Sequence, residues 1–193
     1  SGSTRELLTG ERTLLNFIQQ LSGVATVAHI FQEALKGGKT KVLDTRKTLP
    51  GFRTLQKYAV RVGGGSNHRM GLFDMVLVKD NHIAAAGGVL EALEVVKKNN
   101  AENLMVEMEV ESLEDLKKLL HKGVDVIMLD NMSNEMMAEA LEIIKESGDK
   151  VLVEGSGNMT LERAKEIATL GLDYISVGAL THSVKALDIS MRI

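Results

Sequence analysis

The sequence predicts an α/β domain built on a TIM-like (β/α) barrel, atypical or incompletely closed, with six to seven parallel strands after a long helix. Short apolar runs alternate with helical segments from residue 41 onward. The runs are nearly all apolar, as in Val126–Leu129, which is typical of parallel strands buried on both faces. After the second strand the connections shorten to about twenty residues, the length of βα units. An open doubly wound sheet is the alternative.

The elements follow in order along the chain. A long helix is expected from about Glu11 to Lys36, because apolar residues return to one face at the 3.6-residue helical period. Gly37 and Gly38 end it, since glycine commonly follows the last helical turn. The strands are expected at Lys41–Asp44, Met75–Lys79, Leu104–Val110, Val124–Leu129, Val151–Glu154 and Tyr174–Val177. The helices between them are expected at Arg53–Val60, Gly88–Lys98, Leu113–Lys122, Asn134–Ser147 and Leu161–Leu170.

The composition indicates a single barrel domain over residues 4–193, after a short segment, Ser1–Ser3, that resembles a linker or an expression-tag remnant. The chain has no cysteine, which excludes disulfides, a thiolate nucleophile and a cysteine-based zinc site. No apolar run reaches the ~18 residues of a spanning helix, and no secretory signal is visible. These features predict a cytoplasmic enzyme-like domain that does not bind membranes.

Positive charge is concentrated in one part of the chain. Between residues 44 and 82 lie the four cations Arg46, Lys47, Arg69 and Lys79. The whole chain carries 23 Lys and Arg against 26 Asp and Glu, a net charge of -3. The positive charge is therefore local, which indicates a small polyanionic ligand rather than a nucleic acid lattice.

The polar residues that end the expected strands fall into an ordered series. Cations end the first two strands, acids lie on the third and fourth, and small residues end the last two. Taken singly, each has an ordinary structural explanation, such as a barrel ion pair, a turn or a surface histidine. These explanations do not account for the order of the residue types along the series of strands. The acids are Glu107, Glu109 and Asp130, and the small residues are Ser156 and Gly157 after Glu154 on the fifth strand and Gly178 after the sixth, followed by His182.

This order has a chemical sense, because ligands of parallel α/β folds bind at the carboxyl ends of the strands. Arginine and lysine hold carboxylates. Glu109 and Asp130 are suited to sugar hydroxyls or to Mg²⁺, which prefers oxygen ligands. Ser156, Gly157 and Gly178 are suited to present backbone N–H groups to a phosphate. A carboxylate pocket, a ribose clamp and a phosphate cradle together predict phosphoribosyl transfer to a carboxylated acceptor.

Several motifs also resemble one family, over nearly the whole chain from about Leu7 to Ile193. They are Leu-Thr-Gly-Glu-Arg-Thr (8–13), Leu-Ser-Gly-Val-Ala-Thr (21–26), Asp-Thr-Arg-Lys-Thr (44–48), Lys-Tyr-Ala-Val-Arg (57–61), Gly-Gly-Gly-Ser-Asn-His-Arg-Met-Gly (63–71), Lys-Asp-Asn-His (79–82), Met-Leu-Asp-Asn-Met (128–132) and Ser-Val-Gly-Ala-Leu-Thr-His (176–182). These motifs are similar to those of quinolinate phosphoribosyltransferase.

The resemblance implies an enzyme of NAD synthesis that joins quinolinate to phosphoribosyl pyrophosphate with Mg²⁺, releasing pyrophosphate and carbon dioxide to give nicotinate mononucleotide. It implies that Lys79, Glu109 and Asp130 are catalytic, with Lys79 between the two substrates and the acids at the ribose and its metal. It assigns the acceptor carboxylates to Arg46, Lys47, His68 and Arg69, and a phosphate to Ser156, Gly157, Gly178 and His182.

The resemblance covers only the barrel of this family, whose members begin with an α+β domain that supplies an arginine to a neighbouring subunit. We therefore expect weak or no activity from this chain by itself, and a homodimer or larger homo-oligomer through apolar surface on the first helix and the last segment. Two alternatives stay open. One is a non-catalytic barrel scaffold that binds phosphate or phosphoribosyl pyrophosphate. The other is transfer to nicotinate, for which four cationic side chains exceed the need of one carboxylate.

Overall fold

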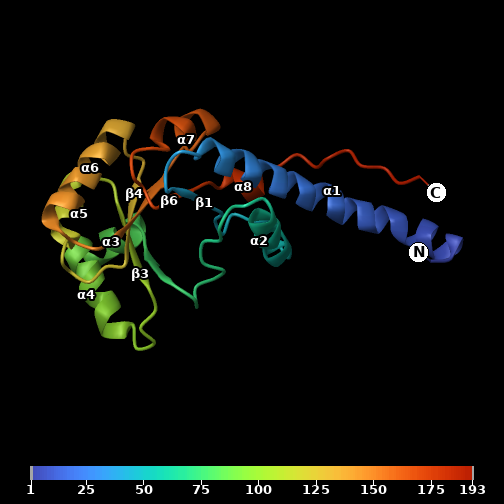
Figure 1. Ribbon diagram of the computed structural model, residues 1–193. Coiled ribbons are helices and arrows are strands. Elements are labelled where there is room, and N and C mark those ends of the chain that lie inside the picture. Colours follow the sequence, from blue (N-terminus) through green and yellow to red (C-terminus); the bar gives the residue numbers. More distant parts are fainter. Residues whose placement is uncertain (1, 193) are drawn as a thin grey trace.

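Six parallel strands form one sheet in the computed structural model, which describes residues 2–192. Ser1 and Ile193 lie outside the described residues. The strand order is β1-β6-β5-β4-β3-β2. From β2 to β6 each strand pairs with its successor in the chain, and β6 then pairs with β1, which is the order of a barrel sheet (Figure 1). The doubly wound alternative is wrong, because its strand order reverses in mid-sheet. The bounds are β1 Lys41–Leu43, β2 Val76–Val78, β3 Val106–Val110, β4 Val126–Asp130, β5 Leu152–Ser156 and β6 Tyr174–Ser176.

The sheet is open at one place, between β1 and β2. No ladder joins these two strands within residues 2–192. The segment after the second helix lies beside β1 instead, where Leu43 and Ser66 form an isolated parallel bridge. Ser66 N–H donates to Val42 O at 2.8 Å, and Asp44 N–H donates to Ser66 O at 3.2 Å. The parallel α/β class is confirmed, and the seam between β1 and β2 corresponds to the incomplete closure expected from the sequence.

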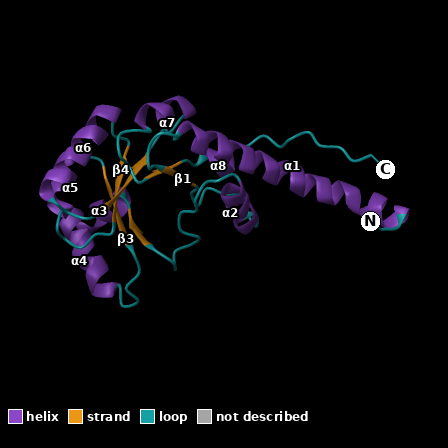
Figure 2. Cartoon of the chain, viewed as in Figure 1, coloured by secondary structure: helices purple, strands orange, loops and turns teal. Residues whose placement is uncertain are grey.

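Helices cover the outside of the sheet (Figure 2). The helix Asn134–Ser147 has the predicted bounds, because Ser133 accepts from Met136 N–H at 3.2 Å and Gly148 ends it with φ 74°. Two short helices that follow β2 and β6 were not predicted. The bounds are α1 Thr4–Ala34, α2 Arg53–Val62, α3 Asp80–Ala86, α4 Val89–Asn99, α5 Leu113–Leu119, α6 Asn134–Ser147, α7 Leu161–Ile167 and α8 Ala179–His182.

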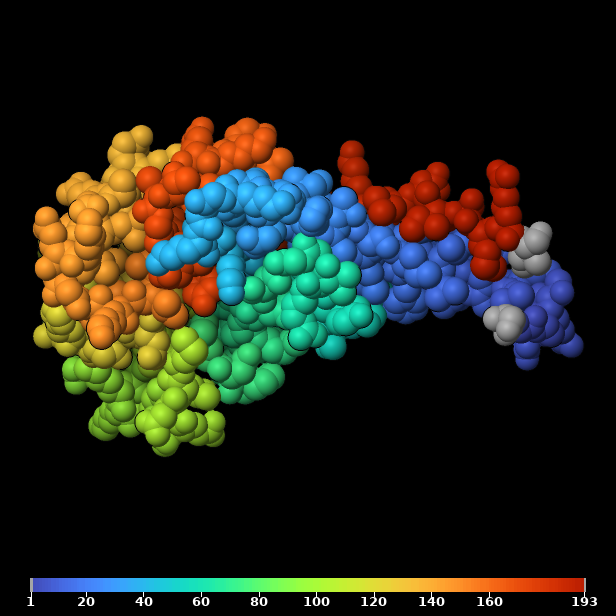
Figure 3. All heavy atoms as spheres, in the orientation of Figure 1, coloured from blue at the N-terminus to red at the C-terminus, as the bar shows by residue number. Residues whose placement is uncertain are grey.

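Helix α1 begins earlier than predicted and has two different halves. Ser3, assigned to a linker from the sequence, caps the helix in a reciprocal bond pattern with Glu6. The first half projects from the barrel, with the C-terminal segment beside it (Figure 3). The second half buries Val24, Ala28 and Phe31 in the core. By length and composition α1 is long and apolar enough to cross a membrane. This is weak evidence for a membrane span, because the second half of the helix packs on the barrel.

The barrel interior holds charged side chains as well as apolar ones. All five residues of β3 are buried, including Glu107 and Glu109, which share one face of the strand. Glu154 on β5 is also buried. The Asp44 carboxylate after β1 and the Lys57 ammonium on α2 form a fully buried ion pair. The fold therefore places ionisable groups beneath the carboxyl ends of the strands.

Candidate functional site

Two adjoining cavities lie at the carboxyl ends of the strands. The cationic cavity, of about 420 Å³, is lined by Thr45, Arg46, Lys47, Arg53, His68, Arg69, Leu77, Lys79, Met128, Ser156 and Ser176. The polar cavity, of about 510 Å³, contains the ends of β4 to β6 and is lined by residues that include Asp130, Asn131, Ser156, Gly157, Asn158, Gly178 and His182. Both cavities are lined by Thr45, Lys47, Lys79, Ser156 and Ser176, so a ligand can extend from one into the other.

Most of the site residues predicted from the sequence line one of the two cavities. Arg46, Lys47, His68, Arg69 and Lys79 line the cationic cavity. Asp130, Ser156, Gly157, Gly178 and His182 line the polar cavity. Glu109 lines neither and lies behind Lys79, whose Nζ is 2.6 Å from Glu109 Oε2. The structure therefore brings the predicted set together, with Glu109 one step back from the cavity walls.

Arg53, which the sequence reasoning did not single out, supports the loop that carries the first two cations. Its Nε donates to Thr48 Oγ1 at 3.0 Å, one terminal nitrogen donates to Met70 O at 3.1 Å, and the other donates to Arg46 O at 3.1 Å. The guanidinium therefore ties residues 46–48 to residue 70. The signal available in the sequence was an arginine at the first position of the helix after a cationic loop.

A buried ion pair supports the next two site residues. The Asp44 carboxylate accepts from Lys57 Nζ, from Asn67 Nδ2 and from His68 N–H, the last at 3.0 Å. Lys57 Nζ also donates to His68 O at 2.8 Å. Burial raises the pKa of Asp44 in spite of these donors. The backbone of residues 67–68 is thereby fixed on both sides, and the following Arg69 is placed at the cavity wall.

Arg69 is buried, and it lines both the cationic cavity and a second cavity in the barrel interior. One terminal nitrogen donates to Met75 O at 3.0 Å, across the seam between β1 and β2. Burial lowers the pKa of Arg69, and the positive charge of Arg46 lowers it further. An anionic ligand bound between Arg69 and Arg46 would offset the repulsion between their positive charges.

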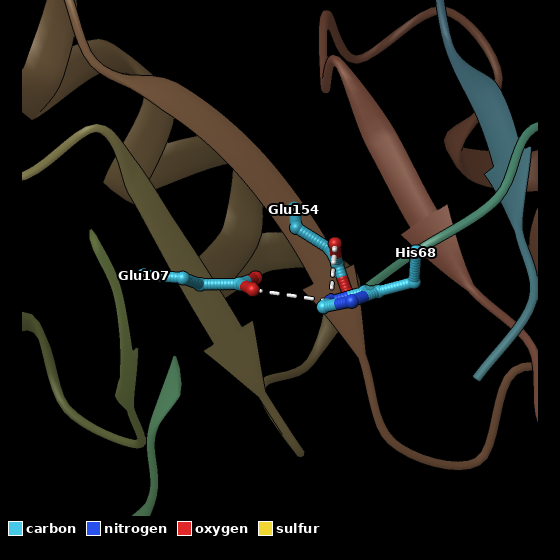
Figure 4. Close-up of side chains that lie close together, drawn as sticks. All are labelled: His68, Glu107 and Glu154. Carbon is cyan, nitrogen blue, oxygen red and sulfur yellow. Dashed lines mark ion pairs between the residues drawn. The ribbon is translucent and has the colours of Figure 1, made fainter. Parts of the chain in front are cut away.

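The His68 ring is held by contacts inside the protein (Figure 4). Its Nδ1 accepts from Arg69 N–H at 2.7 Å, so the proton of the neutral ring lies on Nε2. His68 Nε2 is 3.1 Å from Glu107 Oε2 and 3.6 Å from Glu154 Oε2. Nε2 is thus close to both acids, but within residues 2–192 neither oxygen of Glu107 has a hydrogen-bond partner. The contact with an acceptor carboxylate that the resemblance implies requires a turn of the ring, because Nδ1 already accepts from Arg69 N–H.

Glu107 and Glu154 form a buried acid pair next to His68. Burial raises the pKa of Glu154 well above its usual value, and the Glu107 charge raises it further. The donor atoms of the three residues lie within 4.8 Å of one another, a spacing that a metal ion could use. However, the Arg69 N–H bond leaves the proton on His68 Nε2, so the ring offers no lone pair to a metal. A proton on Glu154 is the simpler way to offset the buried charge.

Lys79 lies on the wall between the two cavities. Its ammonium pairs with Glu109, whose other carboxylate oxygen, Oε1, accepts from Asp80 N–H at 3.3 Å. The backbone N–H of Lys79 donates to His82 Nδ1 at 2.9 Å, which opens helix α3. Lys79 is about half exposed, with 45% of its side chain accessible, whereas Glu109 is buried. Glu109 therefore holds a cation whose remaining N–H groups face the cavities.

The polar cavity is shaped by the backbone more than by side-chain charge. Asn131, Gly157 and Asn158 all have positive φ, at 55°, 85° and 44°. A side chain at Gly157 would place a Cβ 2.3 Å from Asn131 Oδ1, so only glycine fits there. At Gly178 a Cβ would lie 3.2 Å from Lys47 Cδ. Close approach of these loops leaves the N–H group of Asn158 without a hydrogen-bond partner among the described residues.

The fold and the site define a (β/α) barrel domain with a cationic cavity and a polar cavity at the carboxyl ends of its strands. Residues 24–192 match the model of the family described as quinolinate phosphoribosyl transferase, C-terminal domain. The chain belongs to this family.

Known relatives agree with this membership. The nicotinate-nucleotide pyrophosphorylase [carboxylating] of Mycobacterium leprae is 50% identical over 189 residues, which cover 98% of this chain and 66% of the relative. A probable enzyme of that name in Bacillus subtilis is 44% identical, over all of this chain and 65% of the relative. The crystal structure of NadC from Streptococcus pyogenes superposes with a TM-score of 0.92 at 48% identity, over 99% of this chain and 66% of that one. The chain thus spans about two thirds of the length of its relatives.

Proposed function

We propose that this domain forms the barrel part of a quinolinate phosphoribosyltransferase active site. The observation that carries the proposal is the contact between the cationic and polar cavities, which share Lys47, Lys79 and Ser156 as lining residues. A dicarboxylate acceptor suits the first cavity, a phosphoribosyl donor suits the second, and the reacting atoms then meet at the shared wall. The names of the relatives and the family support this substrate pair.

The cationic cavity provides the acceptor site. Quinolinate carries two adjacent carboxylates, and Arg46, Lys47 and Arg69 offer charge-assisted donors to them. Burial and the nearby Arg46 charge lower the pKa of Arg69, which supports an anionic occupant. The Arg53 bonds and the Lys57–Asp44 pair position the loops beforehand, so that little order has to be gained on binding.

The polar cavity provides the donor site. Backbone N–H groups in the loops after β5 and β6, such as that of Asn158, are suited to the phosphate of phosphoribosyl pyrophosphate. His182 is exposed at the edge of this cavity and adds a further donor. The substrate would bind here with its ribose toward the shared wall and its phosphate toward Gly157 and Gly178.

Mg²⁺ is proposed as the cofactor, and the two predicted ligands differ in how well they fit it. Both oxygens of Glu109 are engaged, by Lys79 and by Asp80 N–H. Asp130 is only partly buried, and Asn131 occupies one of its oxygens at 2.7 Å. Asp130 is therefore the residue that would hold Mg²⁺, which when bound would neutralise charge on the diphosphate and keep several water ligands.

The reaction needs positioning and charge rather than a nucleophilic side chain. The acceptor ring nitrogen bonds to the ribose carbon as pyrophosphate leaves, and the carbon centre carries positive charge on the way. Glu109 and Asp130 supply negative charge near that centre, and Lys79 faces the leaving or adjoining anionic groups. The acceptor then loses its adjacent carboxylate as carbon dioxide, and that ring carbon takes up a proton.

The test combines binding and turnover on the purified chain. Calorimetry with phosphoribosyl pyrophosphate and Mg²⁺ should show binding, and quinolinate should bind more tightly than nicotinate, which has one carboxylate. Formation of nicotinate mononucleotide with release of carbon dioxide would demonstrate the activity. Binding of phosphoribosyl pyrophosphate without binding of quinolinate would favour the scaffold alternative, since weak or no turnover is expected of this chain by itself. If neither phosphoribosyl pyrophosphate nor quinolinate binds, the proposal is overturned.

Two further expectations concern assembly and location. Leu8, Leu14, Phe17 and Ile18 are exposed along α1, which supports association into a homodimer or larger species. Light scattering at increasing protein concentration tests this, and a constant monomer mass would contradict it. The cytoplasmic location stays a prediction.

A further inference from the structure

Arg163 on α7 lies beside the polar cavity and uses all three of its nitrogens on two loops. One terminal nitrogen donates to Gly157 O at 2.7 Å, in the loop between β5 and α7. The other donates to Met132 O, in the loop between β4 and α6. Nε donates to Asn134 Oδ1 at 3.0 Å, at the start of α6. The guanidinium therefore joins the two loops that form this side of the cavity.

The acceptor on α6 is itself oriented. Asn134 Nδ2 donates to Glu166 Oε2 at 2.8 Å, and this bond leaves the amide oxygen of Asn134 directed at Arg163. The planar guanidinium of Arg163 therefore donates to three oxygens whose positions are fixed by the surrounding structure. A lysine, with one nitrogen on a flexible stem, cannot reach all three.

The Gly157 bond determines the direction of a neighbouring N–H group. In a planar trans peptide the C=O and the following N–H point in opposite directions. Since Gly157 O points at Arg163, the N–H of Asn158 points away from it, and Asn158 lines the polar cavity. Gly157 has no Cβ, so its ψ, which turns this peptide plane, can vary at little steric cost. The bond from Arg163 removes that freedom.

We infer that Arg163 is a positioning residue for the phosphate of the donor substrate, acting through the Gly157–Asn158 peptide. It holds this N–H toward the cavity and keeps the β5–α7 loop at a fixed distance from the loop that follows Asp130. The inference rests on the proposed function, because it assigns the polar cavity to phosphoribosyl pyrophosphate. Arg163 does not line either cavity.

The experiment compares two dissociation constants in Arg163→Lys. The variant keeps the charge but loses the fork, so binding of phosphoribosyl pyrophosphate with Mg²⁺ should weaken about tenfold, the effect of one lost charge-assisted bond. Binding of quinolinate should change less than twofold. Calorimetry with each ligand alone measures both, and thermal unfolding of the same samples measures any loss of stability.

Matched variants separate positioning from charge and from folding. Lys165→Met removes an exposed charge from the same helix and should leave both constants unchanged. Arg53→Lys loses the equivalent fork beside the cationic cavity and should weaken quinolinate instead. Asn134→Ala removes one acceptor only and should weaken phosphoribosyl pyrophosphate by a smaller factor, so it serves if Arg163→Lys is poorly folded.

The outcomes are distinguishable. If the wild-type chain binds phosphoribosyl pyrophosphate and Arg163→Lys binds it equally well, the positioning role is overturned and the proposed function stands. Equal weakening of both ligands would also overturn it, since that result indicates a general loss of structure. If the wild-type chain does not bind phosphoribosyl pyrophosphate, the proposed function and this inference both fail.

Discussion

The cationic and polar cavities share a wall but are built by different means. The cationic cavity presents charged side chains, Arg46, Lys47 and Arg69, on loops fixed by Arg53 and by a buried ion pair. The polar cavity presents mainly backbone, bent by positive φ at Gly157 and neighbouring residues. The first depends on which side chains are present, and the second on which backbone shapes are allowed. Substitutions should therefore damage the two cavities through different mechanisms.

The largest effect should come from removing the buried support of the cationic cavity. Lys57→Met leaves the Asp44 carboxylate buried without its ammonium partner, which should lower the free energy of unfolding by about 3–5 kcal/mol. Urea denaturation measures this loss. Lys39→Met breaks the exposed pair with Asp173 and should cost less than about 1 kcal/mol. Equal losses in the two variants would show that the Lys57–Asp44 pair has no special structural role.

Charge removal at the cationic cavity should affect one ligand. Arg46→Ala deletes a donor to an acceptor carboxylate, so quinolinate binding should weaken by about 1.5–3 kcal/mol. Binding of phosphoribosyl pyrophosphate should change little. Arg61→Ala, at an exposed position near the end of α2, is the matched control. Calorimetry measures both ligands, and a loss shared equally by them would contradict the division of the site into two cavities.

A backbone change should have the reverse selectivity. Gly157→Ala adds a Cβ 2.3 Å from Asn131 Oδ1 and imposes about 1–2 kcal/mol of left-handed backbone strain. We expect roughly tenfold weaker binding of phosphoribosyl pyrophosphate, with quinolinate binding unchanged. Gly171→Ala has φ 104° but no atom within 4 Å of the added Cβ, so it reproduces the strain without the collision. If Gly171→Ala weakens binding as much, general destabilisation is the cause.

The smallest effect concerns the acid pair in the barrel interior. The pKa of Glu154 is raised above its ordinary 4.5 in the folded chain, so its contribution to stability is complete below that value and is lost as the pH rises through the folded pKa. Glu154→Gln removes this dependence. The stability of the variant relative to wild type should therefore rise with pH above about 4.5. Urea midpoints from pH 4.5 to 8 would measure it, and parallel curves would show that Glu154 ionises normally.

The sequence predicted the cationic cavity better than the polar one. The positive charge of arginine and lysine can be read directly from the sequence, and the carboxyl ends of the strands meet at one end of any parallel barrel. The support from Arg53 and Arg163 was missed, because it depends on carbonyl directions that no residue pattern encodes. The position of Glu109 behind Lys79 was missed for a related reason. The alternation of side chains along a strand shows which face of the sheet a residue is on, but not how far it lies from a cavity.

The main elements were predictable for a physical reason as well. Apolar runs identified all six strands within a few residues, because a sheet covered by helices needs apolar side chains on both faces. Helices α3 and α8 were missed, since seven and four residues are too few to show a helical period. Helix α1 began early because Ser3 caps it, although its first half buries little.

The seam between β1 and β2 leaves two sheet edges that a bound ligand would connect. The segment that carries His68 and Arg69 lies where a further strand would close the cylinder, and Arg69 already reaches Met75 across the opening. An anion held by Arg46 and Arg69 on one rim and Lys79 on the other would act as an extra rung between the two edges. The amides of β1 and β2 should then exchange hydrogen more slowly in the complex, while those of β4 and β5, already paired on both sides, should change least.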